Sequence, residues 1–216
     1  MNIEEIQAHQ RAFLQKAKDR KESITYNIEG VDIVVNPGVF PPATDTKLLA
    51  AHIKVQRGER ILDLTTGSGA FAIIAGLQGA SGVAVDINPQ AVKNAKENFI
   101  RFGVPMEAIE SDLFQNVPEE RFDQVFANGP FFEGDITDPM DYACYGARKF
   151  IDDLLSSIAT RLKPTGKLLI VLSEGSDLEH FTNTVNKNGL ASIQTTKRTS
   201  DDGERGYRLY QVALPS

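Results

Sequence analysis

The chain has 216 residues, of which 41% are hydrophobic and 24% are charged, and its formal net charge is -6 at pH 7. This length and composition allow a sizeable core, most simply in one globular domain. The acidic balance argues against extensive nucleic-acid binding, because such binding depends on lysine and arginine side chains that displace counterions.

The cysteine content and the apolar runs indicate a cytoplasmic protein. The single cysteine, Cys144, excludes an internal disulfide and any multi-cysteine metal site, which agrees with a reducing compartment. No basic patch followed by an apolar run opens the chain, and no segment approaches the roughly 20 apolar residues of a membrane span. We therefore expect no membrane partner and no metal.

The N-terminal part predicts a cover made of a helix and a β-hairpin. Apolar residues recur at helical spacing over residues 3–22, as in an amphipathic helix. Two β-rich runs around residues 29–30 predict a hairpin that ends at residues 41–42. We assign residues 1–45 to this cover and residues 46–216 to the core of the same single domain.

The core predicts a Rossmann-like, doubly wound α/β sheet of seven strands. A short helix capped by Thr44 or Asp45 comes first, and apolar strands then alternate with helices from residue 60 onward. Such strands form a parallel sheet covered on both faces. The last two strand-like runs are joined by the polar loop DDGERG. They predict a C-terminal antiparallel hairpin on a mostly parallel sheet.

The loops at the carboxyl ends of the strands predict a nucleoside ligand, because ligands bind there in such sheets. Gly67 and Gly69 follow the first strand and allow the backbone to approach a ligand where a helix begins. The second strand ends at Asp86, whose carboxylate can accept both hydroxyls of a ribose. Each feature alone also fits a plain turn or a helix cap, and the two together favour the nucleoside.

Two classes of nucleoside ligand fit these loops. Residues 67–72 match G-x-G-x-x-A, so an NAD-type dinucleotide competes. Asp63 favours S-adenosylmethionine, because its charge would repel a pyrophosphate but can hold an ammonium group. Asp112, after the third strand, is suited to accept a hydrogen bond from an adenine amino group. The C-terminal hairpin and the Asn-Gly-Pro-Phe sequence of residues 128–131 also favour S-adenosylmethionine.

At these positions the chain resembles the class I S-adenosylmethionine-dependent methyltransferases, and within them the branch whose fourth strand ends in Asn-Pro-Pro-Tyr/Phe. That branch includes protein glutamine methyltransferases and methyltransferases of exocyclic amino groups of bases. The resemblance covers about residues 31–216. It departs at Thr65, where glycine is usual, and at Gly129, where the first proline of the tetrapeptide is usual.

The resemblance implies S-adenosyl-L-methionine as the cofactor and a set of residues around it. These are Asp63, Thr65, Gly67 and Gly69 at the methionine part, Asp86 at the ribose, Ile87, Asp112 and Leu113 at the adenine, Thr44 and Thr46 closing over the cofactor, and Asn128 at its border.

The tetrapeptide predicts how a methyl acceptor is held. The Asn128 side-chain oxygen and the Gly129 carbonyl can each accept one hydrogen of an NH2 group, while Phe131 stacks on a planar target. Pro130 keeps Gly129 away from helical geometry. Because an amide or aromatic amino nitrogen is a poor nucleophile, positioning must supply most of the acceleration. The expected acceptor is a protein glutamine or a base.

Two alternatives remain open for this part of the chain. The acceptor is a small metabolite if Asn128 mostly borders the cofactor, and the aromatic pair 131–132 simply fills the core if the motif is only a loop. Four carboxylates in residues 133–141 predict a solvated, mobile lid that favours a neutral or cationic acceptor over phosphates. The basic residues of the N-terminal helix predict a solvated face, namely Arg11, Lys16, Lys18, Arg20 and Lys21.

Overall fold

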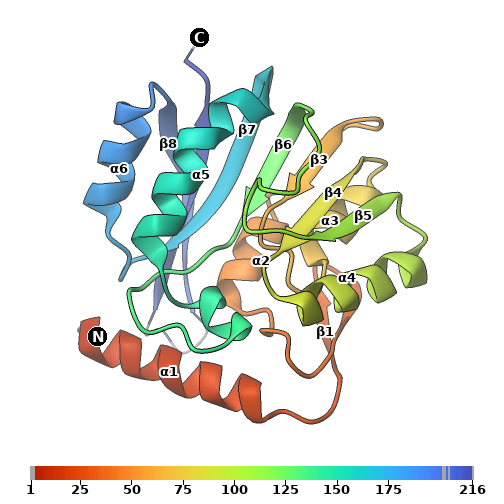
Figure 1. Cartoon of the computed structure of the whole chain (residues 1–216), viewed down its shortest axis with the longest axis vertical. Helices are drawn as coiled ribbons and strands as arrows, with labels where there is room; N and C mark the ends of the chain where they lie inside the picture. Colours follow the sequence, from red (N-terminus) through yellow and green to blue (C-terminus); the bar gives the residue numbers. More distant parts are fainter. Residues whose placement is uncertain (1–2, 201–202, 204, 216) are drawn as a thin grey trace.

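The computed structural model describes residues 3–200, 203 and 205–215 (Figure 1). The predicted N-terminal helix and hairpin are confirmed. They are α1 (Ile3–Asp19), β1 (Ile24–Ile28) and β2 (Val31–Val35), and α2 (Thr44–Ala50) follows. The division of the chain at residue 45 stays a prediction, and α2 spans it. No described helix has the length and apolar character to cross a membrane.

The seven-stranded sheet has the predicted form. Its strand order is β5-β4-β3-β6-β7-β9-β8; β9 runs antiparallel to both of its neighbours, and the other pairs are parallel. The strands are β3 (Arg60–Asp63), β4 (Ser81–Asp86), β5 (Met106–Glu110), β6 (Phe122–Ala127), β7 (Leu162–Ser173), β8 (Ala191–Thr199) and β9 (Gly206–Ala213). The predicted loop between the last two strands lies largely outside the described residues.

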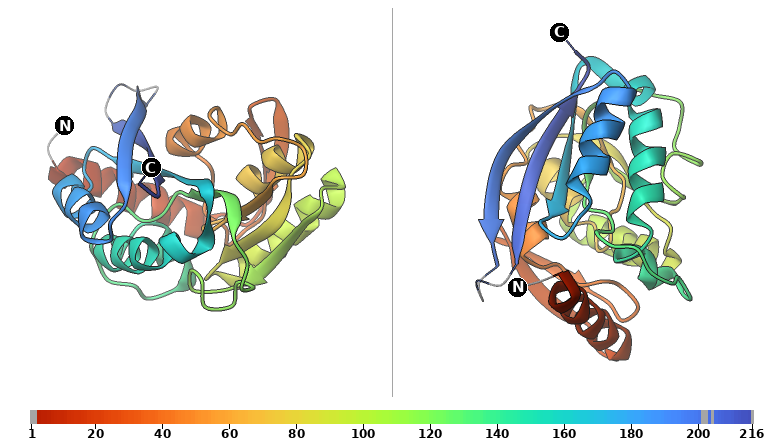
Figure 2. Two further views of the ribbon diagram at one scale, coloured as in Figure 1. Left: turned by 90° about the horizontal axis from the view of Figure 1, so that it is seen from above. Right: turned by 90° about the vertical axis from the view of Figure 1, so that its left-hand side faces the viewer.

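Helices cover both faces of the sheet (Figure 2). Helices α2, α3 (Ala70–Leu77) and α4 (Pro89–Phe102) pack on one face, and α5 (Ala147–Arg161) and α6 (Leu178–Lys187) pack on the other. Successive residues of β6 serve opposite faces, with Val125 packing toward α5 and Phe126 toward α3. The order of strands reverses between β3 and β6, which places a ligand crevice at their carboxyl ends.

Hydrogen bonds from α4 hold the N-terminal hairpin against the core. Asn94 and Asn98 are almost fully buried, and both donate from Nδ2 to the Val34 carbonyl, at 3.0 and 2.8 Å. The Asn36 N–H donates to Asn94 Oδ1 at 2.9 Å. Because these buried amides have partners on the hairpin and at its end, the hairpin is part of the folded unit rather than an appendage.

Helix α1 docks on the short 3-10 helix η1 (Pro139–Ala143), which lies in the predicted lid. Leu14 and Ala17 of α1 form a small buried cluster with Met140 and Cys144. Asp141 is 3% exposed and accepts hydrogen bonds from the Thr137 N–H and hydroxyl. The prediction of a solvated segment is therefore wrong for Asp141, because η1 folds this carboxylate inward.

Two of the basic residues of α1 and its C-terminal extension are also partly buried. Lys18 pairs with Asp138 and Asp141, so it joins α1 to η1. The Arg20 guanidinium donates to three backbone carbonyls, those of Val35, Asn36 and Val39. The predicted solvated face is wrong at these two positions, since both side chains hold the cover together.

Candidate active site

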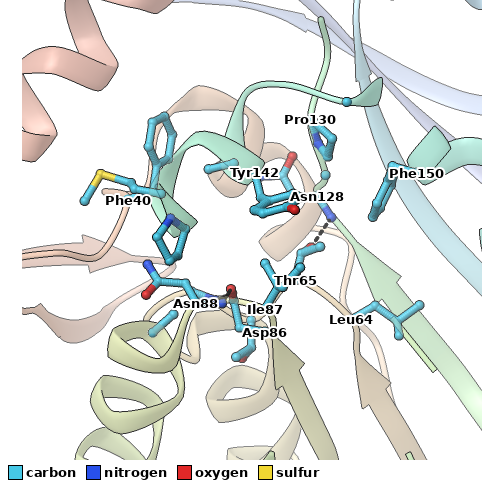
Figure 3. A pocket seen from close by; sticks show the side chains of 18 of the residues that line it. Phe40, Leu64, Thr65, Asp86, Ile87, Asn88, Asn128, Pro130, Tyr142 and Phe150 are labelled. Atoms are coloured by element: carbon cyan, nitrogen blue, oxygen red, sulfur yellow. Dashed lines mark hydrogen bonds between the residues drawn. The ribbon is translucent and has the colours of Figure 1, made fainter. Parts of the chain in front are cut away.

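A cavity of about 280 Å³ lies at the carboxyl ends of β3, β4, β5 and β6 (Figure 3). The loops after these strands form one part of its wall, and residues of α1, α2, α3, α4, η1 and α5 and of the segment 40–42 also line it. Most of the predicted site residues meet here. Those that line the cavity are Thr46, Thr65, Gly67, Asp86, Ile87, Asp112, Leu113, Asn128, Gly129, Pro130 and Phe131. Thr44, Asp63 and Gly69 are not among the residues that line it.

The two glycines after β3 have different roles. Gly67 has φ +53°, and a side chain there would meet nothing within 4 Å, so its backbone stands open to the cavity. Gly69 begins α3 with φ +89°, and a Cβ there would lie 2.7 Å from Cε1 of Phe99 on α4. Helix packing is thus a structural reason for this glycine, and its part in admitting a ligand stays a prediction.

Asp86 joins the loops after β3 and β4. Its Oδ2 accepts from the Gly67 N–H at 2.8 Å, and its Oδ1 accepts from the Asn88 N–H at 2.9 Å. Burial raises the pKa of Asp86, and the N–H donors partly offset that rise. The cap of α4 is Asn88, which accepts from the Gln90 N–H at 3.0 Å. The helix-cap alternative for Asp86 is therefore excluded.

Asp63 lies behind the glycine loop and is 0% exposed. Its Oδ2 accepts from the Thr66 hydroxyl at 2.8 Å and from the Ala72 N–H at 3.3 Å, while its Oδ1 is buried without a hydrogen-bond partner. Burial raises the pKa of Asp63 to about 7, against the effect of these donors, and the nearby charge of Asp86 adds to the rise. Within the described part of the chain no cation pairs with Asp63.

Asn128 is held from two sides. Its backbone N–H donates to the Thr65 hydroxyl at 2.9 Å, the dashed line in Figure 3. Its Nδ2 donates to Asp45 Oδ2 at 3.0 Å and reaches the Thr46 hydroxyl at 3.5 Å, while its Oδ1 is buried without a partner. Threonine at position 65 thus ties the glycine loop to Asn128, which gives a structural reason for this departure from the family pattern.

The start of α2 differs from the prediction. The N-cap is Ala43, and the Thr46 hydroxyl accepts from the Ala43 N–H at 3.3 Å. Thr44 and Asp45 are therefore not caps. The Asp45 carboxylate is 8% exposed and accepts a hydrogen bond from Asn128 Nδ2, far away in the sequence. Sequence reasoning missed Asp45 as a site residue because an acidic residue at a helix start has a sufficient local explanation.

Gly129 is matched to Phe150 at the start of α5. A Cβ at Gly129 would lie 2.3 Å from Cε1 of Phe150, so the phenyl ring fills the space that a proline at position 129 would need. Phe150 also lines the cavity (Figure 3). The second departure from the family tetrapeptide is thus coupled to a distant aromatic residue, and no local sequence signal predicts that coupling.

Phe131 is mostly inside the core. It is 6% exposed, and its ring packs against Phe132 and Tyr207 with centroids 6.4 and 6.0 Å away. Its role in stacking on a planar target stays a prediction. Further aromatic residues that the sequence did not single out also line the cavity, and among them Tyr142 of η1 is 42% exposed. These residues are Phe40, Phe71, Tyr142, Tyr145 and Phe150.

The comparison with known families agrees with this geometry. A model described as the methyltransferase small domain matches residues 30–199. The chain belongs to this family. It is therefore a methyltransferase, and its cofactor is S-adenosyl-L-methionine. The NAD-type dinucleotide is not supported.

Relatives of this family are similar over most of the chain. A putative protein N5-glutamine methyltransferase of Methanocaldococcus jannaschii is 33% identical over 68% of this chain and 78% of its own length. A tRNA1(Val) (adenine(37)-N6)-methyltransferase of Dyadobacter fermentans is 31% identical over 62% of this chain, which spans 59% of that relative. The T. thermophilus 16S rRNA N2 G1207 methyltransferase has a similar fold, with a TM-score of 0.66, 22% identity, and coverage of 90% of this chain and 50% of that chain.

The residues around the cavity fit the cofactor. The unpartnered Oδ1 of Asp63, buried outside the cavity lining, is suited in charge to an ammonium group, and the backbone at Gly67 stands open on the cavity wall. Asp86 carries its carboxylate on the cavity wall, next to Ile87. A buried carboxylate without a cation inside the chain can pair with the ammonium group of the cofactor. A second carboxylate on the cavity wall can accept hydrogen bonds from the ribose hydroxyls.

Proposed function

We propose that this protein transfers the methyl group of S-adenosylmethionine to a planar amide or amino nitrogen. The observation that carries the proposal is the state of Asn128: its Nδ2 is engaged by Asp45, and its Oδ1 is buried without a partner. A buried oxygen without a donor is costly. An NH2 group of an acceptor is the partner that this oxygen and the neighbouring Gly129 carbonyl can share.

The residues on the cavity wall have separate tasks in this reaction. S-adenosylmethionine supplies a methyl group on a positively charged sulfur. Asn128 Oδ1 and the Gly129 carbonyl each accept one N–H of the acceptor, which aims the nitrogen lone pair. The new N–C bond forms as the C–S bond breaks, and the nitrogen then releases one proton to solvent. Such orientation is worth roughly 7–11 kcal/mol when it is complete.

The cofactor-side roles are part of the same proposal. Asp63 receives the ammonium group behind the glycine loop, and Asp86 receives the ribose hydroxyls. Ile87, Asp112 and Leu113 border the adenine. Thr46 lies on the wall beside Asn128, whereas Thr44 and Gly69 support the site from outside the cavity. The names of the relatives, which specify glutamine N5 and adenine N6, support a planar nitrogen as the acceptor.

A small-metabolite acceptor is the second candidate, and the cover of the cavity favours it. Gln10 of α1 and Met140 and Tyr142 of η1 all line the cavity, so the cover narrows the approach to Asn128. A glutamine on an exposed peptide loop or a flipped-out base must pass this cover, whereas a small planar amine or amide needs less room. Both candidates use Asn128 in the same way.

Labelled methyl transfer tests the proposal. The protein and S-adenosylmethionine with an isotopic methyl group are offered glutamine peptides, tRNA and a small-metabolite fraction, and the methylated atom is identified by mass spectrometry. We expect label on nitrogen and a loss of turnover of about 10²-fold or more in Asn128→Ala, with cofactor affinity nearly unchanged. Label on oxygen or carbon, or equal turnover in Asn128→Ala, would contradict the proposal.

A further inference from the structure

Asp45 is a buried carboxylate to which the proposed methyl transfer assigns no direct task. It lies in the first turn of α2, lines the cavity and is 8% exposed. Its Oδ2 accepts from Asn128 Nδ2 at 3.0 Å, across 83 positions of sequence. Burying a carboxylate is unfavourable, so a contact of this kind indicates a role that offsets the cost.

The chemistry of the pair determines how the Asn128 amide is turned. An ionised carboxylate only accepts hydrogen bonds, so only the NH2 side of the amide can face Asp45. The Thr46 hydroxyl stands on the same side of Asn128, at 3.5 Å from Nδ2. Oδ1 is therefore directed away from α2, where it is buried and has no partner. This orientation follows from the hydrogen-bonding capacity of the groups.

We propose that Asp45 is the positioning residue of Asn128. The ionised carboxylate of Asp45 fixes the amide of Asn128 with its Oδ1 turned toward the methyl acceptor. This inference rests on the proposed methyl transfer to nitrogen. Asp45 acts through Asn128 and does not touch the acceptor. Without it, the amide can turn by 180° and offer an NH2 group to the NH2 group of the acceptor, which leaves two donors facing each other.

The proposal has a consequence for the dependence of turnover on pH. Protonated Asp45 becomes a donor and can bind Oδ1 of Asn128, so the productive orientation is lost as pH falls. Burial raises the pKa of Asp45, and the Asn128 donor and the charge of Arg205 partly oppose the rise. Among the described residues, Cys144 at the end of η1 is a further titratable group that interacts with Asp45. The loss therefore begins at a higher pH than for an exposed aspartate.

Asp45→Asn tests the proposal, because it keeps the shape but lets the Asn128 amide adopt either orientation. We expect kcat to fall about 10-fold or more, while the dissociation constant of S-adenosylmethionine, measured by calorimetry, changes less than about threefold. The acid limb of the kcat profile should disappear in the variant. The matched control is Asp32→Asn, which makes the same charge change on an exposed residue of the distant N-terminal hairpin and should leave every value unchanged.

A second measurement does not depend on turnover. The side-chain amide resonances of Asn128, assigned by selective ¹⁵N labelling and by their absence in Asn128→Ala, should shift with pH in the wild-type protein and lose that shift in Asp45→Asn. If the variant does not fold, the wild-type titration still decides, because a flat Asn128 signal overturns the proposal. Unchanged kcat in a folded Asp45→Asn protein overturns it as well. Failure of the proposed function has a different signature, namely no methyl transfer to nitrogen by the wild-type protein.

Discussion

Two buried carboxylates, one on the cofactor side and one on the cover, have pKa values that are shifted in opposite directions. On the cofactor side, Asp63 is fully buried without a cation, and burial raises its pKa to about 7. On the cover, burial acts on Asp141 in the same direction, but the Lys18 ammonium and the Thr137 and Asp138 donors outweigh it and lower the pKa to about 2. The chain thus neutralises the charge of Asp141 internally, whereas no cation among the described residues pairs with Asp63.

The two regions also differ in the reach of their contacts. Asp86 accepts hydrogen bonds from Gly67 in the loop after the neighbouring strand and from Asn88 in its own turn, at separations of 19 and 2 positions. Asn128 depends on Thr65 and Asp45, at 63 and 83 positions, and Lys18 reaches Asp141 across 123 positions. The cofactor side is therefore built largely by adjacent strand ends, whereas the acceptor side requires the whole fold to assemble.

Asp86→Ala should separate the two regions most strongly. Loss of hydrogen bonds to a charged group, each worth about 1.5–3 kcal/mol, should weaken S-adenosylmethionine binding about 100-fold. Turnover at saturating cofactor should change only a few-fold, the reverse of the pattern expected for Asn128→Ala. Calorimetry and steady-state kinetics measure both values, with Asp32→Ala on the distant hairpin as the control. An equal loss of cofactor affinity in Asp86→Ala and Asn128→Ala would remove the distinction between the regions.

Gly129→Ala tests the match between Gly129 and Phe150. The added Cβ overlaps the Phe150 ring, so we expect a loss of about 2 kcal/mol in the free energy of unfolding. The double variant with Phe150→Ala should be less destabilised than the sum of the two single variants, because the overlap is gone. Urea unfolding of the three variants measures this coupling. Strict additivity would show that the ring yields without cost.

Lys18→Met tests how the cover is held. Removing the ammonium leaves Asp141 buried without its main cation, so we expect a loss of about 1 kcal/mol, or about 3 °C in Tm, at pH 7. Because the pKa of Asp141 is lowered to about 2, its contribution is present above about pH 4 and is lost between about pH 4 and pH 2. The variant should lose less stability than wild type over that window.

The control for Lys18→Met is Lys149→Met, which breaks an exposed pair with Asp153 and should change Tm by less than about 1 °C. Thermal unfolding followed by circular dichroism at a series of pH values measures all three proteins. An equally small change in Lys18→Met would mean that the cluster of α1 and η1 holds without the ion pair.

The smallest expected signal is a fraction of a proton. With a pKa of about 7, Asp63 is protonated in about half of the molecules at pH 7, and an ammonium group favours the ionised form. Cofactor binding should therefore release about half a proton at pH 7, more at pH 6 and almost none at pH 9. Calorimetry in buffers of different ionisation enthalpy measures the release, and Asp63→Asn should abolish it. Release that persists in Asp63→Asn would assign the proton to another group.

Sequence patterns predicted the fold and most of the residues that line the cavity, but not the contacts that Asn128 and Gly129 make. Gly67 and Asp86 are recognisable because they end consecutive strands, and parallel strands bring their ends together by geometry. Asp45 was interpreted as a helix cap, since a local explanation was available. Phe150 carried no signal at all, because a phenylalanine at a helix start is usually a core residue.

The sequence by itself determined the order and type of the elements, the antiparallel C-terminal hairpin and the residues at the strand ends, because hydrophobic periodicity and turn residues act over a few positions. Only the tertiary structure decided that the Asn128 amide nitrogen meets Asp45, why position 129 is glycine, and how Lys18 and Asp141 close the cover. Each of these depends on partners that become neighbours only when the sheet and its cover have packed together.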